Sequence, residues 1–130
     1  MTELPVISWG LYDNERDAAG ATYRWTADHA VLLARQQAST VTLALRRSDA
    51  TPVGPVQARI DASGGRTIVT LDSGAWKFAT MRLRPNALAW LRAGQRVDVT
   101  VSPWFVPAVA DPLSTDLRRH GVELRIVSIQ

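Results

Sequence analysis

The sequence predicts an all-β fold: an antiparallel β-sandwich, jelly-roll-like, with about eight or nine strands and one or two short helical turns. Apolar and polar residues alternate with a period of two in several segments, which is typical of half-buried strands. Clusters of Gly, Pro, Asp and Ser separate these segments at intervals of about 8–12 residues. The length of 130 residues suits one hydrophobic core. We therefore expect a single sandwich domain over residues 1–130.

Four segments alternate most clearly. In residues 40–46, three aliphatic side chains fall on one face of a strand and more polar ones on the other. The same pattern marks three further segments: Val56–Asp61, Gln95–Val101 and Val122–Ile126. After Ile126 the apolar residues move to the alternate positions of the strand, Val127 and Ile129. That slip predicts a bulge, or a strand covered on both faces.

The remaining elements are predicted from shorter signals. Runs of β-branched, aromatic or aliphatic residues suggest five more strands: Val6–Trp9, Tyr23–Thr26, Ala30–Ala34, Thr67–Leu71 and Lys77–Leu83. Ser63-Gly64-Gly65, between two strand patterns, predicts a hairpin loop. Two stretches interrupt the strand spacing, Pro85–Gly94 and Asp111–Gly121. Each combines an early proline with helix formers and a final glycine, so each predicts a short helical turn.

Composition excludes several classes of function. The chain has no cysteine, so disulfides, thiolate metal sites and cysteine nucleophiles are absent. The pI near 10.2 accompanies a net charge of only +3, and the arginines are scattered, which argues against nucleic-acid binding. No apolar run is long enough to span a bilayer, so we expect no direct membrane insertion. The acidic cluster within residues 1–20 also argues against a signal peptide.

Motifs for catalysis and cofactors are missing. There is no GxSxG, P-loop or GxGxxG pattern, and the two histidines do not form a ligand pair, so we expect no catalytic residue and no cofactor. Asp13, Glu15 and Asp17 do occupy the first, third and fifth positions of a calcium-loop count. Ala18 stands where that loop needs glycine. These three acids are calcium candidates; the alternative is a solvated acidic turn paired with an arginine.

Five tryptophans are many for a chain with two Tyr and two Phe. We expect Trp25 and Trp76 in the core or at its edge, and Trp90 over one end of the sandwich. The pattern around Trp9 is compatible with a side chain on either the buried or the exposed face of its strand. Trp104 lies in a loop between two prolines, where it serves either as a hydrophobic lid or as a stacking platform for a sugar ring.

Four short stretches carry a family resemblance. They are residues 10–15 (Gly-Leu-Tyr-Asp-Asn-Glu), 23–26 (Tyr-Arg-Trp-Thr), 104–108 (Trp-Phe-Val-Pro-Ala) and 116–122 (Asp-Leu-Arg-Arg-His-Gly-Val). In this order they resemble the small carbohydrate-binding-like β-sandwich modules associated with bacterial membrane glycosyltransferases. The resemblance implies an extracytoplasmic or periplasmic location and a glycan or lipid-linked sugar as ligand, held near a membrane-bound glycosyltransferase.

A jelly roll gathers its loops at the ends of the sandwich. We therefore expect one region to hold the candidate ligand-binding residues Trp104, Tyr12, Glu15, Arg24, Asp116 and Arg118. Within it, Arg24 is expected to neutralise Glu15, and Arg118 to neutralise Asp116. This network either pins the loop Phe105–Gly121 to the end of the sandwich or presents donors and acceptors to sugar hydroxyls beside Trp104. The leading hypothesis is a non-catalytic carbohydrate-binding or accessory module of the cell envelope. The alternatives are a structural protein–protein interaction module without sugar affinity and a small hydrolase that uses Glu15 or Asp116.

Overall fold

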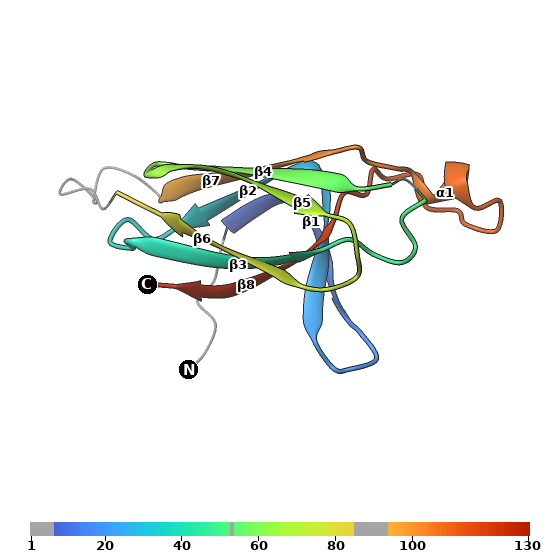
Figure 1. Cartoon of the computed structure of the whole chain (residues 1–130), viewed down its shortest axis with the longest axis horizontal. Coiled ribbons are helices and arrows are strands. Elements are labelled where there is room, and N and C mark those ends of the chain that lie inside the picture. Colours follow the sequence, from blue (N-terminus) through green and yellow to red (C-terminus); the bar gives the residue numbers. More distant parts are fainter. Residues whose placement is uncertain (1–6, 53, 85–93) are drawn as a thin grey trace.

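The computed structural model describes residues 7–52, 54–84 and 94–130. Within these residues the chain forms eight β-strands and one short helix (Figure 1). The elements are β1 (Ile7–Arg16), β2 (Thr22–Ala34), β3 (Thr40–Arg46), β4 (Val56–Ala62), β5 (Gly65–Leu71), β6 (Lys77–Arg82), β7 (Gln95–Ser102), α1 (Pro107–Ala110) and β8 (Glu123–Ile129). The prediction of an all-β chain is confirmed.

Every strand pairing is antiparallel, and the strands form one nearly closed sheet in the order β5-β4-β7-β2-β8-β3-β6, with β1 paired to β2. Its end strands β5 and β6 lie against each other. Figure 1 shows β4, β5 and β7 in one layer and β3, β6 and β8 in the other. The finer jelly-roll description stays a prediction, because the strands form one continuous hydrogen-bonded sheet.

Strand β2 connects the two layers. Arg24 and Trp25 pair with β8, whereas His29–Ala34 pair with β7. The two short strands predicted at Tyr23–Thr26 and Ala30–Ala34 are therefore one strand of 13 residues. Its partner β1 bulges at Gly10, which has φ 71° and lies so close to β2 that a Cβ there would stand 2.1 Å from the His29 carbonyl oxygen.

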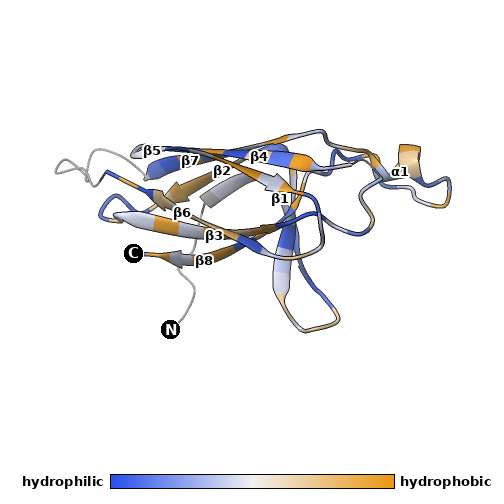
Figure 2. Cartoon of the chain, viewed as in Figure 1, coloured by the Kyte–Doolittle hydropathy of each residue, from blue (hydrophilic) through white to orange (hydrophobic). Residues whose placement is uncertain are grey.

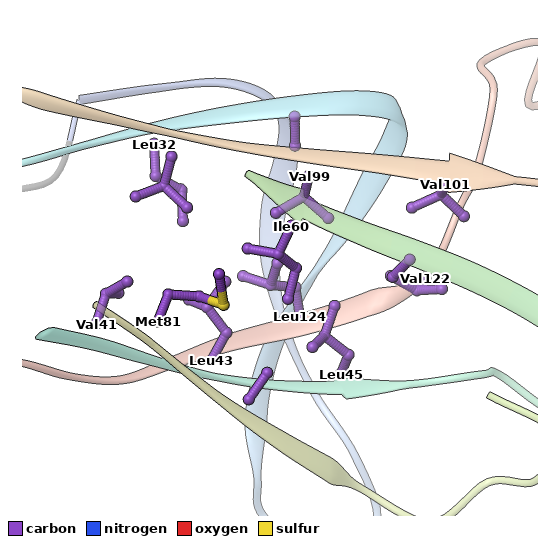
Figure 3. Packing of buried hydrophobic residues seen from close by; sticks show 14 of the residues in the cluster. Leu32, Val41, Leu43, Leu45, Ile60, Met81, Val99, Val101, Val122 and Leu124 are labelled. Carbon is purple, nitrogen blue, oxygen red and sulfur yellow. The ribbon is translucent and has the colours of Figure 1, made fainter. Parts of the chain in front are cut away.

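The core forms where the predicted alternation places aliphatic side chains. Leu43, Ile60 and Val99 have no exposed surface, and they come from three strands and both layers (Figure 3). The outward positions of β7 carry polar residues, including Arg96 and Asp98. The predicted phase slip in the last strand is a bulge: Thr42 pairs with Ser128 and Leu43 with Ile126, so Val127 is skipped.

Helical turns were predicted less well. The helix α1 lies before the predicted stretch Asp111–Gly121, and that stretch contains no helix. Instead, side-chain oxygens of Asp111, Ser114 and Asp116 each accept a backbone N–H two residues further on, which stabilises turns in place of helix. The turn predicted at Pro85–Gly94 and the side chain of Trp90 fall outside the described residues. Among the described residues, no helix is long and apolar enough to cross a membrane.

Candidate ligand-binding site

The candidate site is built on the long connection from β7 to β8. This connection returns to its starting point, because Phe105 and His120 exchange two backbone hydrogen bonds of 3.0 and 2.7 Å. It is also fastened to β2, since the Gly121 N–H donates to the Thr26 carbonyl at 2.8 Å and the Val122 N–H to the Thr26 hydroxyl at 3.0 Å. The base of the loop is therefore fixed to the sheet.

A buried histidine organises the base of this loop. The ring of His120 packs against three aromatic rings, with centroid distances of 4.7 Å to Trp25, 5.2 Å to Tyr12 and 5.8 Å to Phe105. Its Nε2 lies 2.9 Å from a carboxylate oxygen of Asp116, and its Nδ1 is buried without a partner among the described residues. From the sequence, this histidine was considered only as a possible metal ligand, so its structural role was missed.

Asp116 and Arg118 form the ion pair that the sequence predicted. The guanidinium of Arg118 donates to both carboxylate oxygens, at 3.0 and 2.9 Å, and the Arg118 backbone N–H adds a third bond. These donors, together with His120, hold the pKa of Asp116 far below its usual range. The same guanidinium lies over the ring of Tyr12, 4.3 Å from its centroid. The predicted association of Tyr12, Asp116 and Arg118 is confirmed.

Trp104, Arg119 and Asp28 form a second group at the surface, which we call the Trp104 shelf. The Arg119 guanidinium stands 4.4 Å from the centroid of the Trp104 ring and 3.3 Å from a carboxylate oxygen of Asp28. Trp104 remains 39% exposed, so its side chain is both held and accessible to solvent. Tyr12 links the two groups, because its hydroxyl donates to the Arg119 carbonyl at 2.6 Å.

Glu15 and Arg24 do not join this arrangement as predicted. The Nε of Arg24 donates to Asn14 Oδ1 at 2.9 Å, and among the described residues no ion pair links Arg24 to Glu15. The reason is register: Asn14 stands opposite Arg24, while Glu15 stands opposite Tyr23. Adjacent residues of a strand point to opposite faces, so Arg24 and Glu15 are separated.

The calcium candidates are also distributed differently from the prediction. Asp13 and Glu15 belong to β1 rather than to a loop. Asp17 is engaged in its own turn, where one oxygen accepts the Ala21 N–H at 2.8 Å and the other accepts Arg46 at 3.1 Å. Across residues 7–52, 54–84 and 94–130, no group of three acidic or histidine side chains is arranged to hold a metal ion. The alternative reading, an acidic residue paired with arginine, describes Asp17.

The other tryptophans divide between core and surface. Trp25 is buried, as predicted, and packs edge-on against Phe105. Trp76 is half-buried beneath the guanidinium of Arg46, which lies 4.2 Å from its ring centroid. Trp9 is 57% exposed on β1. Of the four tryptophans that the structure describes, Trp9 and Trp104 thus offer the most aromatic surface to solvent.

The site combines the elements that bind a polar ring compound: an accessible aromatic face, a fixed carboxylate and fixed guanidinium donors. Asp116 stays ionised and oriented by Arg118, so it is a constant hydrogen-bond acceptor. Arg119 is oriented by Asp28. In comparisons with known proteins, no family model, no curated protein and no solved structure matches this chain.

Proposed function

We propose that this chain is a non-catalytic carbohydrate-binding or accessory module. The observation that carries the proposal is the Trp104 shelf, where an exposed indole is held against Arg119. Sugar rings present C–H faces that pack on an aromatic plane, and a held ring loses less conformational entropy when a ligand binds. Arg119 covers part of the indole and leaves accessible surface for a ligand.

The polar groups around the shelf support the same proposal. Asp28 and the Asp116–Arg118 pair supply acceptors and donors at fixed positions, as the hydroxyl groups of a sugar require. The charges of these side chains are already balanced by ion pairs, so they favour a neutral polar ligand over a strongly charged one. Tyr12 links the Asp116–Arg118 pair to the Trp104 shelf, because its hydroxyl donates to the Arg119 carbonyl.

The environment of Asp116 favours binding over catalysis. A general acid needs a pKa near the working pH, and the pKa of Asp116 is lowered by Arg118 and His120. Glu15, the other carboxylate suggested for a hydrolase, is exposed on β1 and shares no hydrogen-bond partner with Asp116 among the described residues. The hydrolase hypothesis therefore gains no support from these two residues.

The proposed partner and place depend on the motif resemblance. We propose a glycan or lipid-linked sugar as ligand, and a membrane-bound bacterial glycosyltransferase on the extracytoplasmic or periplasmic side as neighbour. The support for this part is the order of the matched motifs, within which Tyr12, Trp104, Asp116 and Arg118 lie. Contacts within the site bear on sugar binding and not on the identity of the enzyme.

Titration with a panel of bacterial polysaccharides tests the proposal. Trp104→Ala is expected to lose about 1–3 kcal/mol of binding free energy, by analogy with other aromatic stacking platforms, while the melting temperature stays close to that of the wild type. Trp9→Ala is the matched control, because it removes another exposed tryptophan outside the shelf. A panel in which no glycan binds, or in which both variants bind like the wild type, would refute it.

A second function is favoured by a different observation. The β7–β8 connection exposes three aliphatic side chains, Val109 at 83%, Leu113 at 91% and Leu117 at 78%. Figure 2 shows hydrophobic colouring on α1, which belongs to this connection. Exposed apolar groups on a loop held by its own hydrogen bonds suit a protein–protein contact. This interaction module predicts no response to sugars. It also predicts binding of an apolar-surface dye such as ANS that is lost in Leu113→Ser/Leu117→Ser.

A further inference from the structure

A cavity of ≈340 Å³ lies apart from the Trp104 shelf and shares no lining residue with it. It is formed by the β1–β2 turn, the start of the β3–β4 connection, the β5–β6 loop and the first residue of β8. Its walls are Asp17, Ala18, Ala19, Arg46, Arg47, Ser48, Asp49, Gly74 and Glu123. The volume is at the lower end of the range of small-molecule sites, which is about 300–1,000 Å³.

Arg46 is the central group of this cavity. Its Nε donates to Glu123 Oε1 at 2.7 Å and its Nη1 donates to Asp17 Oδ2 at 3.1 Å, while Nη2 forms an ion contact of 2.5 Å with the same Glu123 oxygen. One face stacks on Trp76. Its Nε–H and one Nη1–H are used in these hydrogen bonds, so N–H groups remain on Nη1 and Nη2 for a ligand oxygen. The cation is thus held rigidly at the cavity wall.

Glu123 is buried, with 4% of its surface exposed, and burial raises its pKa despite the neighbouring Arg46. A buried ion pair is seldom needed for stability, since apolar residues of similar size often serve equally well. Ionisable groups placed at a cavity are more frequent where a ligand binds. The position of the Arg46–Glu123 pair therefore indicates a role in ligand binding.

The charges in the cavity are not balanced. Three carboxylates, those of Asp17, Asp49 and Glu123, face two guanidiniums. Arg47 directs its donors to the backbone carbonyls of Thr51 and Gly54, at 2.8 and 3.1 Å. Among the described residues, no side chain forms an ion pair with Asp49. One carboxylate thus remains for a cation on the ligand.

The walls are fixed before any ligand binds. The Asp17 turn is closed by backbone bonds between Asp17 and Ala21 and between Gly20 and Asp17, each 3.0 Å. Ser48 closes the next turn through its carbonyl, which accepts the Thr51 N–H at 3.0 Å. Gly74 leaves room for Asp49, because a Cβ at that position would stand 3.3 Å from its Oδ1. Such preorganisation lowers the entropy cost of binding.

We propose that this cavity binds an amino sugar, a compact hydroxylated ring that carries a protonated amine. The ammonium group pairs with Asp49, and ring hydroxyls accept from Arg46 and donate to Asp17. This second site goes beyond the proposed function and does not require sugar binding at Trp104. Asp49 and Arg46 together select this class over neutral sugars, which leave Asp49 unpaired, and over acidic sugars, which meet excess negative charge.

Calorimetric titration with glucosamine near neutral pH tests the assignment. The wild type is expected to bind glucosamine at least about tenfold more tightly than glucose, since a charge-assisted hydrogen bond contributes on the order of 1.5–3 kcal/mol. Asp49→Asn removes that difference. Asp72→Asn, a charge-matched variant of a neighbouring loop carboxylate outside the cavity lining, is expected to bind like the wild type. Equal glucosamine affinity in wild type and Asp49→Asn overturns the proposal.

Two further measurements distinguish this cavity site from binding at the shelf and from binding of a simple amine. Trp104→Phe is expected to bind glucosamine normally, and glucosamine is expected to change the fluorescence of Trp76, which contacts Arg46. If glucosamine binding disappears in Trp104→Phe, the ligand belongs to the shelf and the cavity site is refuted. If a simple alkylamine binds as tightly as glucosamine, the hydroxyl contacts are refuted and the cavity takes a basic side chain instead. The polysaccharide response of Trp104 is measured separately, so failure of the cavity site and failure of the shelf are distinguishable.

Discussion

Replacing Arg46 by methionine is expected to destabilise the fold by leaving a buried carboxylate without its partner. Arg46 donates a hydrogen bond of 2.7 Å to Glu123, forms an ion contact of 2.5 Å with the same carboxylate oxygen, and stacks on Trp76. Methionine retains most of the side-chain volume and none of the charge. The variant therefore isolates the electrostatic role of the guanidinium from packing.

The magnitude follows from the burial of the pair. Removing one partner of a fully buried ion pair typically costs about 3–5 kcal/mol. The side chain of Arg46 is 16% exposed, and Ser48 also acts to lower the pKa of Glu123. We therefore expect a loss of about 2–4 kcal/mol in the free energy of unfolding near pH 7. Arg46→Met/Glu123→Leu, which removes both charges, is expected to lie within about 1.5 kcal/mol of the wild type.

Urea denaturation at several pH values measures both variants. In Arg46→Met the folded-state pKa of Glu123 is raised further above its unfolded value of about 4.3. A raised carboxyl pKa means that stability is greatest below the unfolded pKa and is lost as pH rises through the folded one. The deficit of the single variant should therefore shrink at acid pH. A loss below about 1 kcal/mol near pH 7, or a deficit independent of pH, contradicts this reasoning.

Two further predictions concern Asp116 and the bulge in β1. Since Arg118 lowers the folded-state pKa of Asp116, its ionised form stabilises the fold above about pH 4 and this contribution is lost as pH falls. The melting temperatures of wild type and Asp116→Asn should therefore differ at pH 7 and converge towards pH 2; a constant gap refutes the linkage. Gly10→Ala should cost at least about 2 kcal/mol, because positive φ adds to contact with a backbone carbonyl. Gly20→Ala, with positive φ and open space, should cost about 1–2 kcal/mol, and equal losses in both would contradict the steric argument.

The strands were predictable wherever one face is buried and the other solvated. The segment Thr40–Arg46 was predicted with its observed boundaries, since its alternation reports burial directly. The continuity of β2 was hidden, because residues 27–29 interrupt the apolar pattern at the point where the strand changes partners from β8 to β7. A pattern of single residues carries no information about which strand is the neighbour.

The candidate site was predictable where its contacts are local. Asp116 and Arg118 are two residues apart, and their ion pair follows from that spacing in a turn. Arg24 and Glu15 depend on the register between β1 and β2, which shifts at the bulge of Gly10 and again between Leu11 and Asn14. The Arg46 cavity was missed entirely, because it joins segments as distant as Asp17 and Glu123. The sequence offered two partial signals, the strand pattern that places Arg46 at a strand end and the pairing of an acidic turn with an unspecified arginine.

Observation of the five tryptophan indole N–H resonances during a glycan titration tests the proposed function most directly. Trp104 is exposed on the shelf, whereas Trp25 is buried beside His120 and serves as an internal reference. Sugar binding at the shelf predicts that the Trp104 resonance shifts in a saturable manner while that of Trp25 stays in place. A glycan that binds without moving the Trp104 resonance, or a panel that moves none of the five, would contradict the account.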